Sequence, residues 1–327
     1  MWNRPQQRVT LTSLTTRAEW ENFLAGFPGA TSHHRYDFLE SVAAPLRCKF
    51  IALRVVSGDR PIGLAPLLVK QLGPFCTINW VPFPYLGPLV PPEFIPATLS
   101  ALRLESRRRR ALNHQQSFSY AVTDCGVGGF TSTTDRTFVI PLSGRSDEDL
   151  LAAMHTNRRR GIRYARRLGL EVGPAKTGDF PLMDAWLSQI YAAQGLSSPY
   201  PAGAYEQLFH TFRNTPGWEF TASRLDGQTR AVLITLSTNH CAFAWQYAAD
   251  PSNRSMNAQD LLIWHAIVRA RDTGAVEFDL VGAPNSGVAE YKRRFGALER
   301  NYTVLQRQTR SHRAANAATK YLRRGTA

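Results

Sequence analysis

The chain has 327 residues, 43% hydrophobic and 20% charged, which is enough for about two domains with buried cores and excludes disorder except at the ends. Thirty-nine Lys and Arg against 25 Asp and Glu give a formal charge of +14, which attracts polyanions such as nucleic acid, anionic lipid or phosphorylated substrates. No apolar run reaches the roughly 18–20 residues that cross a bilayer, and residues 1–10 lack the apolar core of a signal peptide, so we expect a cytoplasmic enzyme.

The cysteines carry no metal or disulfide signature. Cys48, Cys76, Cys125 and Cys241 are widely spaced and form no CxxC or Cys–His cluster. We interpret them as small buried apolar residues and expect no metal.

Basic residues gather in three runs, over 107–110, over 158–167 and along the C-terminal tail. Each run fits a solvated face as well as a binding surface. The second run lies between the two expected halves of the chain, which favours a polyanion as partner.

In the first half of the chain, hydrophobic spacing predicts helices, then a hairpin, then a loop and a further helix. Residues 82–88 contain too many prolines for a central strand. The expected elements in chain order are helices over 17–27 and 36–43, strands over 50–56, 61–68 and 78–81, a helix over 96–114, and strands over 119–123 and 137–140.

A helical segment rich in arginine is expected between the halves. Ser146, followed by three acidic residues, is typical of a helix N-cap with a favourable first turn. The helix continues into the arginines, where Gly161 predicts a bend or break, and Gly169 fits a C-cap.

The second half repeats the element order of the first, which indicates a duplication inferred from order alone. Its expected elements are a strand over 170–172, helices over 180–194 and 202–214, strands over 218–225, 229–237 and 242–247, a helix over 256–273, and a strand over 276–280. The expected lobes are 1–144 and 169–310, joined by a linker over 145–168 and followed by a basic tail over 311–327.

A central strand that feeds a helix N-terminus suits an anionic or acyl-carrying ligand. The order resembles the GNAT acetyltransferase fold, present twice. The fold class implied is α/β (α+β), with two GNAT-like lobes in tandem, each a mixed twisted sheet flanked by helices, linked by the Arg-rich segment.

Four stretches resemble the FemAB-like transferases. Asp59–Leu67 is similar to the family's G-x-x-x-G-x-x-P-L hairpin, and Pro84–Val90 to its P-Y-x-G-P segment. Asn157–Leu170 resembles R-x-x-I-R-x-A-x-x-x-G-L. Glu277–Ala283 resembles Y-D-F-x-G, and Glu290–Ala297 resembles the F-K-x-x-F-G that follows it. The resemblance spans roughly residues 30 to 305.

The resemblance implies transfer of an aminoacyl group from aminoacyl-tRNA to an amine, forming a peptide bond. The acceptor implied is a peptidoglycan precursor or an antibiotic-type small molecule, and no cofactor is expected. An aminoacyl ester is already activated, so attack by an amine needs positioning more than covalent help. The sequence accordingly shows no cysteine nucleophile and no Ser-His-Asp pattern.

Two residues are candidates for catalysis. Lys292 stands at the Lys position of the F-K-x-x-F-G motif, where a cation stabilises an oxyanion or binds a phosphate; a surface lysine is the alternative. Asp279 ends an apolar strand, where a carboxylate is costly unless paired or used. It either orients the amine or pairs with Lys292, or it is a structural aspartate that caps a helix or pairs with an arginine.

The Arg-rich segment supplies candidates for binding phosphates of tRNA or of a nucleotide-linked acceptor. Arg158, Arg159 and Arg163 lie within one helical segment, and residues at i and i+4 share a face. A merely solvated face is the alternative interpretation.

Two tyrosines and a loop complete the binding candidates. Tyr85 and Tyr247 lie at a loop entry and a strand end and are expected to line a cleft, with core packing as the alternative for Tyr247.

Where CoA enzymes of the GNAT fold carry [RQ]-x-x-G-x-[GA], this chain has Arg254 to Gln259, with Asn257 and Gln259 in place of both glycines. This weakens the CoA interpretation. We assign no role to the histidines.

Two alternatives to the tRNA-dependent enzyme remain open. A GNAT N-acyltransferase using acyl-CoA or an acyl carrier protein also fits, since an acidic carrier matches a basic surface. A non-catalytic RNA-binding protein on a GNAT scaffold is the third. The partners expected are aminoacylated tRNA and an amine acceptor, with no membrane span and a possible contact with a membrane surface.

Overall fold

The computed structural model describes residues 8–14, 16–27, 29–120, 122, 129–238, 240–283 and 285–313. They fall into two units, one within 1–135 and 301–327, the other within 136–300. This division differs from the expected lobes, because residues 145–168 belong to the second unit and the chain returns to the first after residue 300. Cys125 and residues 314–327 of the expected tail lie outside the described residues.

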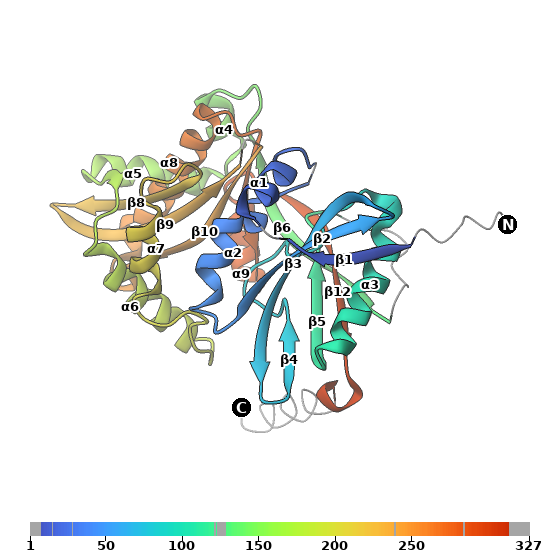
Figure 1. The fold of residues 1–327 in the computed structure, drawn as a ribbon. Helices are drawn as coiled ribbons and strands as arrows, with labels where there is room; N and C mark the ends of the chain where they lie inside the picture. Colours follow the sequence, from blue (N-terminus) through green and yellow to red (C-terminus); the bar gives the residue numbers. More distant parts are fainter. Residues whose placement is uncertain are drawn as a thin grey trace. The chain divides into compact units, whose positions relative to one another are not determined.

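The first unit has a mixed sheet with helices on both faces. Its strand order is β1-β2-β3-β4-β5-β12, and only the β4–β5 pair in this order is parallel. Helix α3 packs beside β1 and β5, while α1 and α2 contact β3 and β2 (Figure 1). The elements are β1 (Val9–Ser13), α1 (Arg17–Ala25), α2 (Tyr36–Ala43), β2 (Lys49–Ser57), β3 (Arg60–Leu72), β4 (Phe75–Ile78), α3 (Ile95–Arg108), β5 (Ala111–Ser117) and β12 (Leu298–Gln308).

The second unit has the strand order β6-β11-β10-β9-β8-β7, in which the β10–β11 pair is parallel. Strand β6 begins in the first unit and enters the second at residue 136. The elements are β6 (Thr131–Pro141), α4 (Asp147–Ala153), α5 (Thr156–Arg167), β7 (Glu171–Pro174), α6 (Asp179–Ala192), α7 (Ala204–Phe212), β8 (Trp218–Leu225), β9 (Gln228–Ser237), β10 (Cys241–Ala249), α8 (Ala258–Asp272), β11 (Glu277–Gly282) and α9 (Ser286–Arg293).

The strands of the two units follow one plan, which confirms the predicted tandem. Strands β1 to β5 correspond in order and direction to β7 to β11, with the parallel pair at the same place. Each sheet is completed from the other half of the sequence. Strand β12 follows β11 in the chain but pairs with β5, while β6 follows β5 and pairs with β11.

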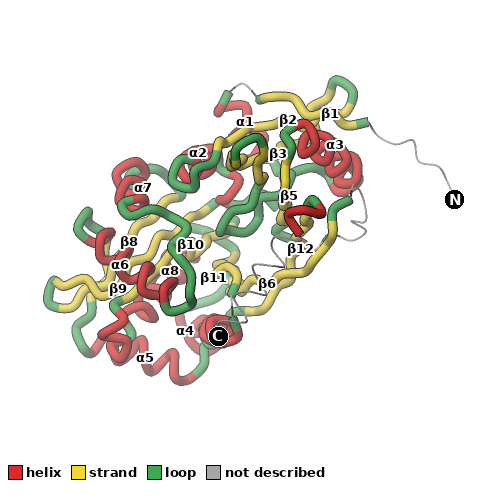
Figure 2. The backbone as a smooth tube through the Cα atoms, turned by 90° about the horizontal axis from the view of Figure 1, so that it is seen from below, coloured by secondary structure: helices red, strands yellow, loops and turns green. Residues whose placement is uncertain are grey.

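Alternate residues of β10 separate the two helical layers of the second unit. Ala242 and Ala244 belong to the core under α8 and α5, whereas Trp245 packs on the rings of Tyr200 and Tyr205 at the α7 side. Figure 2 shows α7 and α5 on opposite sides of β8 and β9. Small residues on one face let α8 approach the strands at the place where the candidate site lies.

The helix predicted over 96–114 ends early. Helix α3 stops at Arg108, and Arg110 adopts a left-handed conformation (φ 53°) that turns the chain into β5. Strand β5 reads Ala-Leu-Asn-His-Gln-Gln-Ser and lacks the apolar and β-branched residues typical of strands, so its composition did not indicate one. Strands β1 and β12 and helix α9 were also not predicted.

The Arg-rich segment forms two helices. Ser146 caps α4 as predicted, because its Oγ accepts the Asp149 N–H at 3.1 Å and the Asp149 carboxylate accepts the Ser146 N–H at 3.0 Å. The break falls at Met154, whose backbone is extended (ψ 150°), and α5 then runs unbroken through Gly161. The bend predicted at Gly161 is therefore wrong, and that glycine serves close packing instead.

Candidate active site

Strands β10 and β11 of the second unit pair at their beginnings and then diverge. The parallel ladder contains Cys241 with Glu277, Ala242 with Phe278 and, last, Phe243 with Asp279. Strand β10 continues to Ala249, whereas β11 bends toward β6 through an irregular register. The ladder between the two strands ends at this last pair.

The bend in β11 is held by Asp279. Its carboxylate, 3% exposed, accepts a hydrogen bond from the hydroxyl of Thr137 at 2.5 Å and another from the N–H of Val281 at 2.7 Å. Val281 has φ 57°, a left-handed conformation that is unfavourable for a β-branched residue. Such strain persists only where the surroundings enforce it, and it concentrates at functional sites.

Lys292 of α9 holds the same bend from the other side. Its ammonium donates to the carbonyl oxygens of Leu280 at 2.5 Å, Val281 at 3.1 Å and Gly282 at 2.5 Å, which matches the three donors of the group. Lys292 is 2% exposed, so the interpretation as a surface lysine is wrong. Burial lowers the pKa of Lys292 from 10.5 to about 8, and the charge of Asp279 opposes the shift.

The two catalytic candidates thus lie on one structural feature, the strained end of β11. Both side chains contact backbone groups there: the Asp279 carboxylate accepts from the Val281 N–H, and the Lys292 ammonium donates to three carbonyl oxygens. In this geometry Asp279 and Lys292 fix the carbonyl and N–H groups beside the diverging strands.

The N-terminus of α8 is occupied by a buried polar network. Asp260, in the first turn and 5% exposed, accepts the guanidinium of Arg158 and the hydroxyl of Tyr291, the latter at 3.0 Å. The Tyr291 oxygen also accepts from Gln259 Nε2 at 2.8 Å. Burial, followed by the charge of Asp260, raises the pKa of Tyr291 well above its ordinary value, so it stays protonated. A carboxylate therefore stands where a helix N-terminus otherwise attracts an anion.

Arg158 belongs to this network and is not a free phosphate ligand, which differs from its predicted role. Its guanidinium lies 4.3 Å from the ring centroid of Tyr291 and 4.7 Å from that of Phe295, in addition to its ion pair with Asp260. Gly161 permits this packing, since a Cβ there would lie 2.8 Å from Asn257 Oδ1. The resemblance found these positions, but only the structure reveals that Arg158 faces inward.

The outer face of α5 remains basic. Arg163 is exposed, and Arg159 is half-buried with a hydrogen bond to Thr156 Oγ1 at 3.1 Å. Neither forms an ion pair with a described acidic residue. Arg160, Arg166 and Arg167 are exposed beside them. This face keeps the charge that the sequence analysis attributed to the segment.

Three predicted binding residues lie near the diverging strands. Tyr247 is half-buried on β10 past the last ladder pair, and burial raises its pKa to about 12, so it remains a hydroxyl donor. Arg254 is exposed in the short helix Pro251–Met256 that joins β10 to α8. Asn257 takes a left-handed conformation (φ 56°), as expected for a residue that replaces glycine, and its Nδ2 donates to Ser255 O at 2.8 Å.

Tyr85 lies in the first unit and does not line an open cleft, which differs from its predicted role. It is 1% exposed, with its ring 5.1 Å from that of Tyr302 and 5.7 Å from that of His33. Burial lowers the pKa of His33 to about 3, so this histidine is neutral. Tyr85 is part of an aromatic core.

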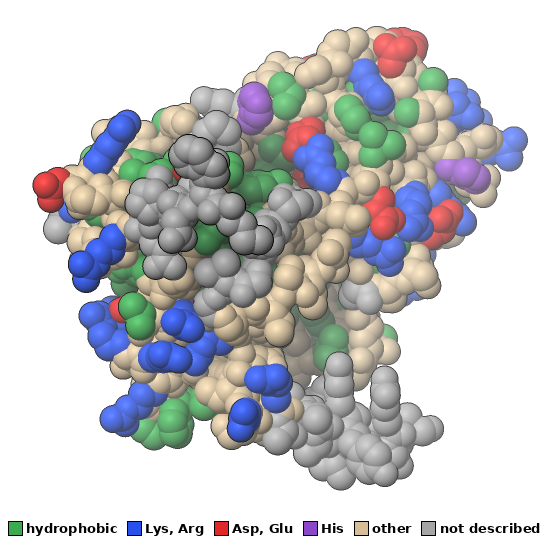
Figure 3. All heavy atoms as spheres, turned by 90° about the vertical axis from the view of Figure 1, so that its right-hand side faces the viewer, with side chains coloured by type: hydrophobic (Ala, Val, Ile, Leu, Met, Phe, Trp, Pro, Cys, Tyr) green, Lys and Arg blue, Asp and Glu red, His purple; other side chains and the backbone are tan. Residues whose placement is uncertain are grey.

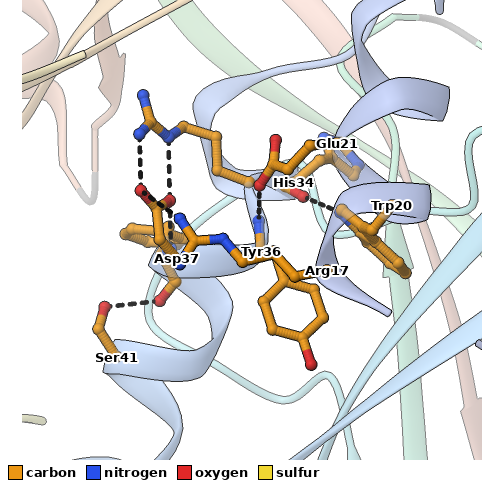
Figure 4. A network of polar contacts seen from close by, with 9 residues as sticks. Arg17, Trp20, Glu21, His34, Tyr36, Asp37 and Ser41 are labelled. Carbon is orange, nitrogen blue, oxygen red and sulfur yellow. Dashed lines mark hydrogen bonds and ion pairs between the residues drawn. The ribbon is translucent and has the colours of Figure 1, made fainter. Parts of the chain in front are cut away.

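A second polar network joins α1 to α2 in the first unit. Asp37, 1% exposed, accepts two bonds from Arg35, at 3.0 and 2.6 Å, and lies 3.7 Å from Arg17 (Figure 4). Burial raises the pKa of this carboxyl, but the Arg35 hydrogen bonds and charge outweigh it and lower the pKa. Trp20 Nε1 donates to the His34 carbonyl at 2.8 Å in the same network. All of these contacts are structural, so we assign the network no catalytic role.

Other kinds of site were sought over the described residues. No group of three His, Cys, Asp or Glu side chains there is arranged to hold a metal ion. Cys48, Cys76 and Cys241 are free thiols in this part of the chain. In the same residues, no helix combines the length and hydropathy needed to span a bilayer.

Comparison with known proteins places the fold. Residues 156–293 match the family described as an acetyltransferase (GNAT) domain. A solved structure of FemX is similar at 12% identity, covering 90% of this chain and 96% of that chain with a TM-score of 0.70. No curated protein sequence matches the chain.

Two further solved structures share the architecture. One is the C-terminal domain of a putative lysylphosphatidylglycerol synthetase from Agrobacterium fabrum, at 14% identity, with 94% of this chain and 98% of that chain covered and a TM-score of 0.59. The other is a tandem GNAT protein from the clavulanic acid biosynthesis pathway, at 12% identity, 91% and 98% coverage, and a TM-score of 0.55. The predicted FemAB-like tandem GNAT fold is confirmed, and the match to the acetyltransferase (GNAT) domain family lies within the second unit.

Proposed function

We propose that this protein is an aminoacyltransferase that moves an aminoacyl group from aminoacyl-tRNA to an amine and forms an amide bond. The amine belongs to a peptidoglycan precursor or an antibiotic-type small molecule. The site is the divergence of β10 and β11 in the second unit, with the strained end of β11, Tyr247 and the loop that carries Arg254 around it.

One observation carries the choice of donor. The helix N-terminus that follows β10, where a GNAT enzyme for CoA receives a pyrophosphate, holds the buried carboxylate of Asp260. Arg158 and Tyr291 already donate hydrogen bonds to that carboxylate. A pyrophosphate at this helix would therefore lie beside the negative charge of Asp260, and Arg158, which is paired with Asp260, would not be free to bind it. A donor that places no pyrophosphate at this helix is therefore favoured, and an aminoacyl ester of tRNA is such a donor.

The reaction needs little more than positioning. The free amine attacks the ester carbonyl, the C–N bond forms as the C–O bond to the ribose breaks, and the proton lost by the amine leaves with the ribose hydroxyl. Backbone N–H groups along β10 are suited to hold the oxyanion. Tyr247, protonated at neutral pH, is suited to donate a hydrogen bond to the reacting groups.

Asp279 and Lys292 act through the backbone in this proposal. They keep the end of β11 bent away from β10, and a relaxed β11 would close the space in which the acyl group lies. The exposed arginines of α5, with Arg254, supply cations for tRNA phosphates. The fold that this chain shares with FemX is consistent with an aminoacyl donor.

Donor transfer tests the proposal directly. Purified protein is given radiolabelled aminoacyl-tRNA pools or, separately, labelled acetyl-CoA, with an amine pool from cell extract as acceptor. We expect label to move to amines from the tRNA pool, and pretreatment with ribonuclease to abolish the transfer. Aminoacyl-tRNA incubated with heat-denatured protein controls for spontaneous aminolysis.

Transfer from acetyl-CoA alone would overturn the donor assignment and identify the chain as an acyl-CoA N-acyltransferase. Protein that binds tRNA but transfers from neither donor, across acceptor pools, would make it a binding protein on a GNAT scaffold. Each outcome leaves the fold intact.

A further inference from the structure

Several strand ends of the first unit meet at one end of its sheet. Strands β3 and β4 form a hairpin in which Leu72 pairs with Phe75, and the next residue, Cys76, pairs with the first residue of β5. On the other side of β5, the N–H of Thr309 donates to the carbonyl of Leu112 at 2.9 Å. The hairpin tip, the turn from α3 into β5 and the end of β12 therefore lie side by side, at the lower end of this unit in Figure 1.

The hairpin tip presents apolar side chains to solvent. Leu72 and Phe75 are each 43% exposed. As direct cross-strand partners they lie on the same face of the hairpin, and Lys70, two residues before Leu72, shares that face. Two neighbouring large apolar side chains at a hairpin tip lower the solubility of the protein and add nothing to its core. Their exposure therefore indicates a surface that binds a partner.

Cations surround this tip. Arg107, Arg110 and Arg310 are exposed, and none of them forms an ion pair with a described acidic residue. The nearby Glu105 is 8% exposed and already engaged by Arg108 at 3.3 Å. Figure 3 shows Lys and Arg side chains gathered over the lower part of one face, with few acidic ones and a hydrophobic one at the lower edge.

The sequence that follows adds charge of the same sign. After Arg313, at the end of the same part of the chain, the sequence contains Lys320, Arg323 and Arg324 and neither Asp nor Glu. We define the hairpin-end surface as Lys70, Leu72, Phe75, Arg107, Arg110 and Arg310.

We propose that the hairpin-end surface docks the protein on an anionic lipid bilayer. Its cations match the charge of acidic headgroups, and Leu72 with Phe75 enters the boundary between headgroups and acyl chains. RNA fits less well, because phosphate binding needs only cations and, of the two exposed apolar side chains, Phe75 alone offers a ring for a base to stack on. The proposal concerns the first unit and holds whichever acyl donor the second unit uses.

Vesicle binding tests it. The full chain is sedimented with vesicles of phosphatidylcholine alone or mixed with phosphatidylglycerol. We expect binding to the mixed vesicles only, weakening as salt rises. The variant Arg107→Gln, Arg110→Asn, Arg310→Gln should weaken partitioning about fivefold per charge removed, the fold-change that corresponds to about 1 kcal/mol. Asn is chosen at position 110 because it tolerates the left-handed backbone there. Leu72→Ser with Phe75→Ser should weaken it by at least a similar factor.

Matched controls come from the second unit. Leu182→Ser with Ile190→Ser removes apolar side chains that are 41% and 37% exposed on α6. Arg160→Gln, Arg166→Gln and Arg167→Gln together remove the same number of charges from α5. Both controls should bind vesicles like the wild type, and thermal melts verify the fold of every variant.

Wild-type protein that ignores phosphatidylglycerol, or controls that lose binding as much as the hairpin-end variants, would overturn the proposal. So would hairpin-end variants that keep vesicle binding but lose tRNA binding in a gel shift, since the surface would then serve RNA. If the apolar variant does not fold, the charge variant decides.

Discussion

The two units follow one strand order but treat the opening in their sheets differently. In the first, β4 leaves β5 after Ile78, where Asn79 takes a left-handed conformation (φ 54°). The chain then fills the space it leaves. The Leu86 N–H donates to Ser117 Oγ at 3.0 Å, and Asn79 Nδ2 donates to the Leu86 carbonyl at 3.2 Å.

In the second unit, β10 and β11 diverge in the same way and no Pro-rich segment returns. The link from β10 to α8 is the short stretch Asp250–Asn257, and the strained carbonyl groups of β11 are held by Lys292. The difference teaches that the duplicated opening is structural in the first unit, while under the proposed function it serves chemistry in the second. Charged side chains accordingly concentrate around the second opening, whereas the returning chain and neutral polar groups fill the first, among them His34, whose Nε2 lies 3.1 Å from the Gly87 carbonyl oxygen.

The largest effect is expected from the ion pair at α8. Arg158→Met leaves the Asp260 carboxylate buried without its cation, which should destabilise the fold by about 3–5 kcal/mol. Chemical denaturation of the single variants and of Arg158→Met with Asp260→Asn measures this in a double-mutant cycle. The double variant should recover most of the loss. Equal destabilisation by the single and double variants would contradict the network as described.

The sequence could predict the tandem because each half carries the same order of helices, hairpin, parallel strand and helix. Motif resemblance located Lys292, Asp279 and the α5 arginines. It could not reveal their orientation, because inward and outward arginines of one helix look alike in sequence. Arg158 faces Asp260, and Arg163, five residues later, faces solvent.

Two further features were not readable from the sequence, for different physical reasons. Strand β5 is polar although it is buried: His114 forms a short hydrogen bond with Ser106 Oγ at 2.5 Å, whereas the side-chain amide of Asn113 has no hydrogen-bond partner among the described residues, and a buried strand of this composition has no recognisable sequence pattern. The exchange of β6 and β12 is a long-range pairing with no local signal. The sequence does place Asp260 in the first turn of α8, where acidic residues are common. Only the structure shows that this carboxylate is buried at the helix N-terminus, where an anionic ligand would otherwise bind.

Lys292→Met tests whether the strained end of β11 matters for transfer. It removes the donors to three carbonyl groups, and we expect the transfer rate to fall by about 100-fold, as a displacement of the site by an ångström can cause. Lys176→Met, at an exposed lysine of the same unit, should leave the rate unchanged. A folded Lys292→Met protein with full activity would remove β11 from the mechanism.

Gly87→Ala probes the filled opening of the first unit. A Cβ at this position would lie 2.7 Å from the Ser117 carbonyl oxygen, so the segment must shift, and we expect destabilisation of about 1–3 kcal/mol. The rate per folded molecule should not change, because this opening is structural. Gly173→Ala, where a Cβ would meet nothing within 4 Å, is the control. A loss of rate without a loss of stability would mean that the first opening also takes part in transfer.

The pH dependence of transfer reports on Lys292 in the wild type. Burial lowers its pKa to about 8, so raising the pH through 8 removes one of the donors that hold the carbonyl groups, and the rate should fall. Between about 8 and 10.5 the unfolded chain retains a proton that the folded chain has released, so this group makes the fold more stable as pH rises. If the transfer rate falls above pH 8 while the contribution of Lys292 to the stability of the fold does not, the loss of activity is not caused by unfolding.

Asp279→Asn sharpens that profile. The charge of Asp279 raises the Lys292 pKa, so its removal should move the falling limb to lower pH. Tyr247, with a pKa of about 12, stays protonated across this range and does not contribute to the limb. A limb that stays in place in the variant would assign it to another group.

The smallest effect is expected at the basic face of α5, and it tests whether charge near the open site serves tRNA. Arg159→Gln with Arg163→Gln removes two cations that have no acidic partner among the described residues, and removing one cation bound to a phosphate lowers the salt slope of tRNA binding by about one. Arg213→Gln with Lys176→Gln removes the same charge from exposed positions of the second unit away from α5. If both pairs change the slope equally, the effect is one of net charge, and α5 is a solvated face. If only the α5 pair changes the slope, tRNA binds along α5, the helix that packs against α8. The tRNA would then bind the second unit, in which the opening between the strands is not filled.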